Sequence, residues 1–473
     1  MTKPFIHPDF LLDTKAASRL YHEYAEPLPV IDYHCHLSPG DIAADRRFEN
    51  MTRLWLAGDH YKWRAMRACG VDEAFITGSA SDWEKFETWA KTVPKTVRNP
   101  LFHWTHLELN RPFGVSGVLL DETSAKAVWD RCNALLGTED FTAQGILKTM
   151  NVEVVCTTDD PVDTLEHHRA YAVRRNKTKT KLVPAWRPDR AMAVEDAAAF
   201  LAYLEKLEAA ANVEIRSFES FIQALGVRHA FFHEFGCRVS DHGLETAYAD
   251  DTTDAEIERI FAKVLMGGPL SPEETSRFKS AMMHEFGVMD FETGWVQQLH
   301  LGALRNTNSR MKQVLGPDAG FDAIGDAAIA QPLARFLDRL DAAGRLPKTV
   351  LFNLNPKDNE LLAALAGCFQ GGRAPGKVQV GPGWWFLDQL DGMTRQLEAL
   401  SNLGLLSLFI GMTTDSRSFL SYPRHEYFRR LLCRILGREM EQGLVPGDLD
   451  LVGALVADLS YHNAKRYFPF AED

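Results

Sequence analysis

Short β-rich runs recur along the chain and alternate with stretches of helical patterning, and this alternation constrains the fold more than any other feature. Each run is apolar and ends in polar or turn residues, which is typical of buried parallel strands. Stretches between them, such as 191–212 and 217–235, carry apolar residues at helical spacing. Eight strands separated by helices predict an α/β fold, a (β/α)8 barrel of the TIM type. The runs are 28–34, 152–161, 181–189, 236–243, 295–302, 349–356, 377–384 and 405–417.

The connection between the first and second runs is anomalous. Residues 37–150 are far longer than an ordinary βα connection, and they are rich in Trp, charged residues and helical patterning. We expect a helical insertion that covers the barrel mouth. The barrel then comprises 28–36 and 151–473, with helices of the stretch 424–471 packed on its outside.

Charge and cysteine usage exclude several classes of protein. The 473 residues include 52 Lys and Arg against 64 Asp and Glu, a net charge of −12, with no basic block. This balance argues against nucleic acid and anionic membranes as partners. The seven cysteines form no CxxC pair, and the chain shows neither a signal-peptide core nor an apolar run long enough to cross a membrane. We therefore expect a cytoplasmic protein with reduced thiols. A homo-oligomer is a separate expectation.

A His-Cys-His motif at the end of the first run is the strongest chemical signal. Side chains alternate along a strand, so His34 and His36 point to the same side while Cys35 points away. Two imidazoles at the rim of a barrel can share one metal ion. The alternative is that both histidines merely cap the strand. Position at the end of the first barrel strand favours the metal.

Further ligands are expected at other strand ends. His300 ends the fifth run and Asp415 ends the eighth. Side chains at the carboxyl ends of barrel strands converge on one point, so two or three histidines and a carboxylate predict a site for Zn²⁺ or a related divalent ion. Asp415 could also be a general base. The alternative is an ordinary aspartate in a turn.

Arginines follow several of the runs. Arg187 ends the third run, Arg305 follows the fifth, and Arg417 lies two residues after Asp415. The guanidinium fork matches a carboxylate, so this set predicts a small acidic substrate. Salt bridges to nearby aspartates are the alternative for each arginine.

Aromatic and polar residues at other strand ends are weaker candidates. Trp384 and Trp385 close the seventh run and predict either a platform for a sugar ring or packing under a loop. Asp241 ends the fourth run and could contact substrate or cap a helix. His60 and Tyr61 lie within the insertion and, without further context, read as surface residues.

Several motifs resemble those of one known family. They are DYHCHL (32–37), GDHYKWR (58–64), TTDDP (157–161), WRPD (186–189), SDHG (240–243), GPGWWF (381–386), DGM (391–393) and GMTTDSRSFLSYPRHEYFRR (411–430). Together they resemble the uronate isomerase family of the amidohydrolase superfamily of metal-dependent barrels, over most of the chain. One departure is Leu387, where that family is expected to carry Asn.

The resemblance implies isomerisation of hexuronates, from D-glucuronate to D-fructuronate and from D-galacturonate to D-tagaturonate. It also implies a divalent metal, usually zinc, at His34 and His36 with Asp415 and His300 nearby.

Moving hydrogen from C2 to C1 through an enediol requires a base at C2 and an acid near the carbonyl oxygen. We expect Asp415 as the base, Tyr61 as a proton shuttle and Arg417 as the group that stabilises the enediol charge. The residues expected to bind substrate are His60, Arg187, Arg305, Asp241, Trp384 and Trp385.

Two other functions compete with isomerisation. A mononuclear zinc hydrolase or deaminase of the same superfamily would use metal-activated water. However, the sixth run ends Asn353-Leu354-Asn355-Pro356, without the His that deaminases of this superfamily place there. A sugar-acid binding protein without activity is the third possibility, and a base paired with an arginine makes it less favoured. The chain also contains no HExxH, GxGxxG, GxxxxGK[ST] or GxSxG motif.

Overall fold

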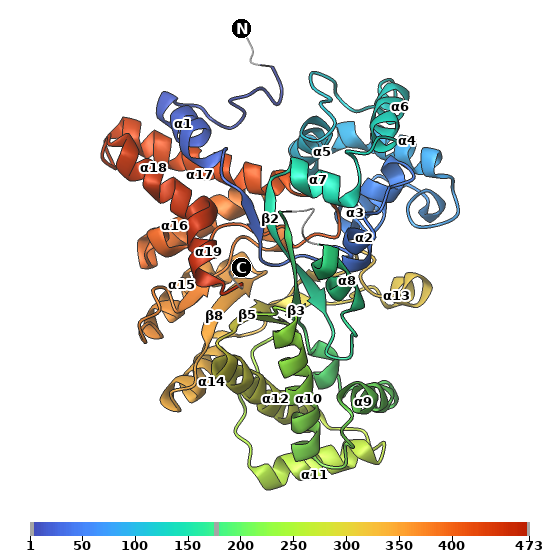
Figure 1. Ribbon diagram of the computed structural model, residues 1–473, viewed down its shortest axis with the longest axis vertical. Coiled ribbons are helices and arrows are strands. Elements are labelled where there is room, and N and C mark those ends of the chain that lie inside the picture. The colour runs from blue at the N-terminus through green and yellow to red at the C-terminus, as the bar shows by residue number, and fades with distance from the viewer. Residues whose placement is uncertain (1–3, 175–178, 471–473) are drawn as a thin grey trace.

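A curled parallel sheet forms the centre of the computed structural model, which describes residues 4–174 and 179–470 (Figure 1). Its seven strands follow one another in chain order, and every neighbouring pair is parallel. Each of the first seven predicted runs overlaps one strand, with β4 and β8 each extending one residue beyond the run, so the α/β class and the barrel-type parallel sheet are confirmed. The strands are β1 (Val30–Asp32), β2 (Val152–Asp159), β3 (Lys181–Trp186), β4 (Val239–Leu244), β5 (Val296–Leu301), β8 (Lys348–Asn353) and β9 (Val378–Val380).

The eighth predicted run, 405–417, differs from the prediction. It contains a single 3-10 turn at Leu406–Leu408 and then an extended segment that is not a strand. The backbone at Gly411 has φ +76° and that at Asp415 has φ +43°, and both values interrupt a regular ladder. Any side chain at position 411 would also collide with the carbonyl of Leu459.

Hydrogen bonds from β1 and the residues after it nevertheless hold this segment beside the sheet. The backbone amide of Asp415 donates to the carbonyl of His34 at 3.2 Å, and the amide of His36 donates to that of Ser416 at 2.9 Å. The buried carboxylate of Asp32 accepts from both the amide (2.7 Å) and the hydroxyl (2.6 Å) of Thr414. The buried carboxylate of Asp32 thus holds this segment against β1, whereas elsewhere in the barrel backbone pairing between strands holds neighbouring segments together.

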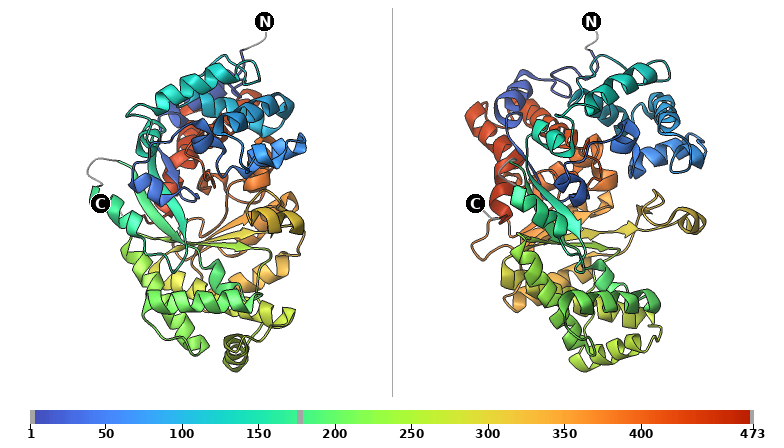
Figure 2. Two further views of the ribbon diagram at one scale, coloured as in Figure 1. Left: turned by 90° about the vertical axis from the view of Figure 1, so that its right-hand side faces the viewer. Right: turned by 45° about the vertical axis from the view of Figure 1, so that its right-hand side comes forward.

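Capped amphipathic helices cover the outside of the sheet. Ser217, Thr253 and Ser271 each form a capping box that starts a helix, which satisfies amide groups left free in the first turn. Figure 2 shows the helices after β3 and β4 gathered at one end of the molecule. The covering helices are α8 (Glu166–Arg174), α9 (Ala197–Ala211), α10 (Phe218–Glu234), α11 (Asp254–Leu265), α12 (Pro272–Thr293), α14 (Ala330–Ala342), α15 (Asn359–Cys368) and α16 (Leu390–Leu403).

The segment 37–150 is helical and lies at the opposite end of the molecule, beside the C-terminal helices (Figure 2). Buried aromatic side chains, Trp55, Phe86 and Trp89, form its interior. Its helices are α2 (Pro39–Ala43), α3 (His60–Ala68), α4 (Asp82–Thr92), α5 (Pro100–Asn110), α6 (Ala125–Leu136) and α7 (Ala143–Thr149). Of the terminal helices, α17 (Pro423–Gln442) packs against α5 of this segment. The others are α1 (Lys15–Arg19), α18 (Leu449–Ala457) and α19 (Asn463–Tyr467).

A small hairpin projects beyond β5. Its strands, β6 (Ala303–Leu304) and β7 (Ala323–Ile324), are antiparallel and flank α13 (Ser309–Leu315). Arg64 and Arg67 of α3 donate to the carbonyls of Asp322 and Ala319, so the hairpin docks against the insertion.

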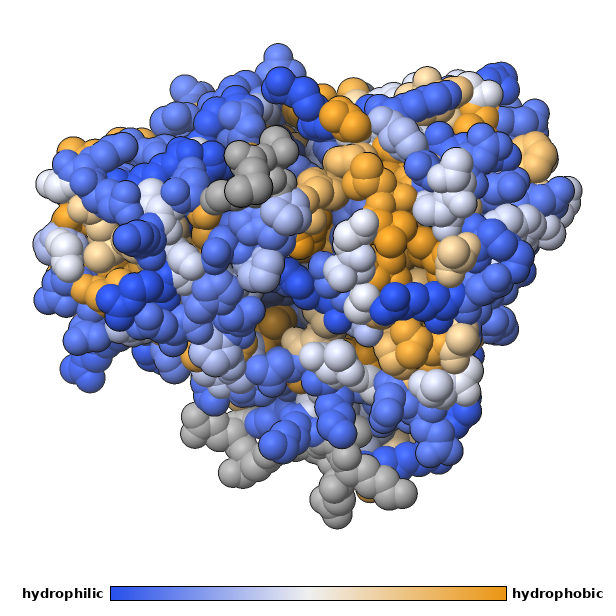
Figure 3. Space-filling model, turned by 90° about the horizontal axis from the view of Figure 1, so that it is seen from above, coloured by the Kyte–Doolittle hydropathy of each residue, from blue (hydrophilic) through white to orange (hydrophobic). Residues whose placement is uncertain are grey.

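Within the described residues, no helix combines the length and the apolar character needed to span a bilayer. The face seen in Figure 3 is mainly hydrophilic, with hydrophobic stretches between the charged side chains.

Candidate active site

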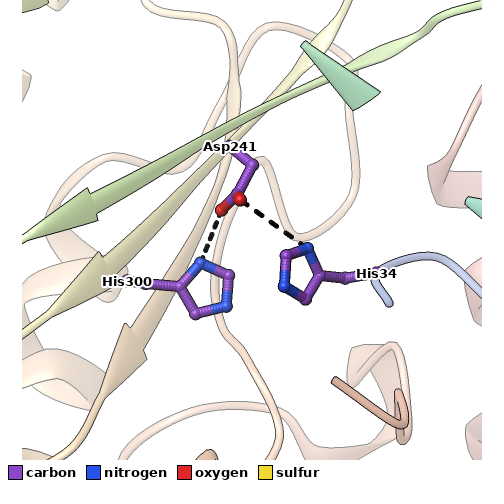
Figure 4. A group of neighbouring side chains, drawn as sticks. All are labelled: His34, Asp241 and His300. Atoms are coloured by element: carbon purple, nitrogen blue, oxygen red, sulfur yellow. Dashed lines mark hydrogen bonds and ion pairs between the residues drawn. The ribbon is translucent and has the colours of Figure 1, made fainter. Parts of the chain in front are cut away.

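Histidine and aspartate side chains meet where the strands end. Two groups of three, His34 with Asp241 and His300, and His34 with His36 and Asp415, place one ligand atom each within 4.8 Å of one another. Figure 4 shows the first group, in which both imidazoles face the carboxylate. The set predicted from separate strand ends is therefore brought together, and Asp241 joins it.

Strand alternation explains why these side chains face inward. In β4 and β5, Asp241 lies opposite Gln298, and Gly243 lies opposite His300. The intervening His242 points outward instead, where its ring stacks on Phe286 of α12.

A chain of hydrogen bonds orients the first group. Asp241 accepts from the Nδ1 of His300 at 2.7 Å and from Arg187 at 2.9 Å. Burial lowers the pKa of His300 to about 4, so its imidazole is neutral near pH 7. Because Nδ1 carries the proton that Asp241 accepts, Nε2 carries the lone pair. That nitrogen and the Nδ1 of His34 make no hydrogen bond within the described residues.

Asp415 joins both histidines of the motif. One of its oxygens lies 3.1 Å from the Nε2 of His34 and 3.0 Å from that of His36, while the other accepts from the indole of Trp384 at 2.7 Å. Burial alone would raise the pKa of Asp415, but the hydrogen bonds from the two histidines hold it well below its usual range. Its φ of +43° is strained for a residue with a side chain, and such strain clusters at functional sites.

The donor set fits a cation. The Nε2 of His300 makes no hydrogen bond within the described residues, and the Nε2 atoms of His34 and His36 both face one oxygen of Asp415. Imidazole nitrogens and a carboxylate oxygen are the donors that divalent transition metals prefer. The chain thus contains a candidate His/Asp metal site.

A cavity of about 500 Å³ opens above this group. Three arginines of its wall are each paired with an aspartate, and guanidinium groups suit a polar, anionic ligand. Arg187 donates to Asp189 at 2.8 Å, Arg305 to Asp322 at 3.3 Å, and Arg417 to Asp318 at 3.0 Å. The wall residues predicted from sequence are His60, Tyr61, Arg187, Arg305, Trp384, Trp385 and Arg417.

Glycine at position 243 is required by the approach of Arg187. A Cβ there would overlap its guanidinium, which sits between Asp189 and Asp241. Asp241 itself lies fully buried beneath the cavity, with its two oxygens taken by His300 and Arg187, so a direct contact with substrate stays a prediction.

The two tryptophans both pack against neighbouring side chains and line the cavity. Trp384 meets the ring of His300 edge-on at 4.8 Å, and Trp385 lies under the guanidinium of Arg305 at 5.0 Å. Both are nearly buried. Neighbouring Leu387 is buried as well and fills its place with apolar packing.

The insertion contributes the first turn of α3. Asp59 caps this helix through the amide of Lys62 at 3.0 Å, which places His60 and Tyr61 against the cavity. The hydroxyl of Tyr61 donates to Asp388 at 3.0 Å, and Arg424 lies 3.4 Å from the same carboxylate oxygen. Neither Asp388 nor Arg424 was singled out from the sequence, although Arg424 belongs to the long motif at 411–430.

Comparison with known proteins agrees with this geometry. The family model for glucuronate isomerase matches residues 1–468. The chain belongs to the glucuronate isomerase family. The uronate isomerase of Cellvibrio japonicus is 59% identical over 466 residues, which cover 98% of this chain and 99% of that protein.

Solved structures of the glucuronate isomerase family share the fold. The uronate isomerase of Thermotoga maritima superposes with a TM-score of 0.92 at 37% identity, covering 98% of this chain and 100% of that one. The glucuronate isomerase of Caulobacter crescentus gives 0.91 at 28% identity, covering 100% and 98%. The family predicted from the motifs and the isomerase activity are confirmed, and isomerisation holds over the hydrolase alternative.

Proposed function

We propose that the chain interconverts D-glucuronate with D-fructuronate and D-galacturonate with D-tagaturonate, by proton transfer between C2 and C1 through an enediol. The observation that carries this proposal is Asp415, an ionised carboxylate at the base of a cavity walled by arginines. An aldose–ketose isomerase needs a base at the reacting carbons and cations for a substrate carboxylate.

Asp415 is the base of the proposed reaction. It takes the proton from C2 and returns it to C1, so the carboxylate is regenerated at the end of each turnover. Its depressed pKa keeps it ionised near pH 7, and its strained backbone holds it in the cavity.

Charge that develops on the enediol needs fixed donors. Arg417 supplies them in the proposal, because it lines the cavity two residues from Asp415. Tyr61, which lines the cavity from the first turn of α3, moves protons at the substrate oxygens. Arg187, Arg305 and His60 bind the C6 carboxylate and hydroxyls.

We also propose that the metal is Zn²⁺, held by His34, His36, His300 and Asp415 with Asp241 behind them. When bound, such an ion would supply positive charge that orients the sugar acid's carboxylate and adjacent hydroxyl. The tryptophans and Asp241 stay predicted substrate contacts.

The insertion at 37–150 covers the cavity mouth in this proposal. Its support is α3, which carries His60 and Tyr61 into the cavity wall. Excluding water there would protect the enediol. A cytoplasmic location, a homo-oligomeric state and the absence of a nucleic-acid partner stay predictions; the seven free cysteines support the first.

Incubation with each uronate in D₂O, followed by NMR, tests the function. We expect D-fructuronate or D-tagaturonate, with deuterium at C1 in those turnovers in which the proton on Asp415 exchanges with solvent before it reaches C1. Conversion without deuterium would contradict exchange through a free enediol, and no conversion by protein of verified metal content would contradict the isomerase proposal.

A further inference from the structure

We propose that Asp388, held in place by Arg424, is the proton reservoir of Tyr61, so that a buried carboxyl behind the phenol controls its hydrogen during isomerisation. This inference rests on the proposed function. Asp388 is a positioning residue in it, since Tyr61 stands between it and the cavity.

The position of Asp388 suits this role. It follows the 3-10 turn Trp385–Leu387 and precedes α16, and its side chain is 5% exposed. Tyr61 lines the cavity, and its hydroxyl donates to Asp388 at 3.0 Å. A proton can therefore pass between the cavity and Asp388 through one phenol oxygen.

Arg424 fixes the carboxyl and connects it to the base. Its guanidinium lies 3.4 Å from Asp388 and donates to the carbonyl of Thr414 at 2.9 Å, one residue before Asp415. The same group lies over the rings of Tyr61 at 5.0 Å and Trp104 at 4.7 Å. One arginine thus orients the phenol, the carboxyl and the segment that carries the base.

The groups around Asp388 allow both its protonated and its ionised form near neutral pH. Tyr61 of α3, Arg424 of α17 and the carboxylate of Asp415 act on it. Arg424 is in turn shared with Asp59 and Glu108, which Lys62 bridges at 2.5 and 3.1 Å. Burial raises the pKa of Asp388 to about 7, although Arg424 and the phenol hydrogen bond lower it.

The two protonation states give Tyr61 different hydrogen bonds. With Asp388 ionised, the single phenol hydrogen is donated to the carboxylate. With Asp388 protonated, the carboxyl donates to the phenol oxygen, and the phenol hydrogen is free to point into the cavity. Only the second arrangement offers an acid to the substrate.

The proton transfers balance over one turnover. As Asp415 takes the C2 proton, Tyr61 gives its hydrogen to O1 and Asp388 gives its own to the phenol oxygen. When C1 is protonated, the O2 hydroxyl returns a proton to Tyr61, which passes its hydrogen back to Asp388. No phenolate is needed, and burial opposes one because it holds the pKa of Tyr61 well above the usual value.

The simplest test is Asp388→Asn, which keeps the shape but cannot exchange a proton. We expect kcat to fall about 10²-fold with little change in KM, metal content or melting temperature. In the wild type, kcat should fall as pH rises through about 7, because the protonated carboxyl is the active form. The variant should lose this step. Asp290→Asn, a buried aspartate bonded to His229 outside the cavity, is the matched control and should keep wild-type kcat.

A double-mutant cycle with Tyr61→Phe separates a reservoir from a structural anchor. If Asp388 acts through the phenol, adding Asp388→Asn to Tyr61→Phe should change kcat less than about 2-fold. The same full loss in both backgrounds, or wild-type kcat in Asp388→Asn, would overturn the inference.

If Asp388→Asn does not fold, the pH profile of Tyr61→Phe decides instead. Loss of the step near pH 7 supports the inference, and its persistence overturns it. A wild-type protein that leaves both uronates unchanged would refute the proposed function itself, which distinguishes the two failures.

Discussion

The floor of the cavity and its wall are built from the same residue types in different ways. On the floor, the Asp241–His300 pair comes from adjacent strands, and its side chains are 0% and 2% exposed. On the wall, the Arg417–Asp318 pair joins the segment after Asp415 to the hairpin beyond β5, and its side chains are 36% and 50% exposed.

Exposure decides what each pair can do. A buried, hydrogen-bonded pair is costly to break and fixes geometry, whereas a half-exposed pair contributes little and exchanges partners readily. The floor is therefore suited to holding a metal in one arrangement. On the wall, Arg417 is suited to exchanging its internal partner, the carboxylate of Asp318, for the carboxylate of a substrate.

The strongest way to break the floor is Asp415→Asn. We expect kcat to fall about 10³-fold, because the base is lost while the amide still bonds to the histidines. Steady-state kinetics with circular dichroism would check it. Normal turnover in a folded variant would remove Asp415 as the base.

Asp241→Asn tests a residue of the floor that acts on the metal site through His300. It weakens the bond that fixes the tautomer of His300, so we expect metal affinity to fall about 10–100-fold, measured by competition with a chelator. Asp290→Asn, another buried aspartate that bonds to a histidine, is the matched control and should leave metal affinity unchanged. Equal losses in both variants would point to general destabilisation instead.

Asp318→Asn tests whether a carboxylate of the wall competes with the substrate for Arg417. It frees Arg417 and relieves Arg305, whose nitrogen lies 3.7 Å from Asp318. Since the internal competitor is removed, we expect KM for uronate to fall about 2–5-fold with kcat little changed. Asp251→Asn, which removes an exposed carboxylate from the half-buried Arg339 outside the cavity, should leave KM unchanged. A rise in KM for Asp318→Asn would show that Asp318 helps to orient the arginines.

The smallest expected effect is that of pH on the affinity for a sugar acid. Burial lowers the pKa of His60 to about 4, so this imidazole is neutral from pH 6 to pH 8 and gains charge only in acid. Calorimetry with a dicarboxylic sugar acid that cannot isomerise should therefore give affinities within about 2-fold at these two pH values. Binding that tightens markedly as pH falls from 8 to 6 would show that His60 charges in this range.

Residues at the ends of strands or just beyond them were the ones that sequence patterns could identify. His34 and His36 follow from alternation at a strand end, and His300 from its place at the end of the fifth run. Asp388 and Arg424 carry no such signal. An aspartate that follows a 3-10 turn resembles any turn aspartate, and its partner Tyr61 lies 327 positions away.

The segment 405–417 is not the strand that was predicted, but it lies beside β1 at the place expected for the eighth strand. Its apolar residues are those of a strand, but the positive φ at Gly411 and Asp415 prevents a regular ladder. Asp32 and the backbone after β1 hold the segment beside the sheet by side-chain and isolated backbone bonds. Asp415 therefore reaches the histidines by a route that propensity does not describe.

The sequence by itself determined the order of strands and helices, the paired histidines and the family, because periodicity and motif spacing are local properties. Only the tertiary structure decided that Asp241 lies beneath the cavity, that Asp318 faces Arg417 and that Asp388 stands behind Tyr61. Those contacts join residues distant along the chain, and packing of the whole fold, not local propensity, brings them together.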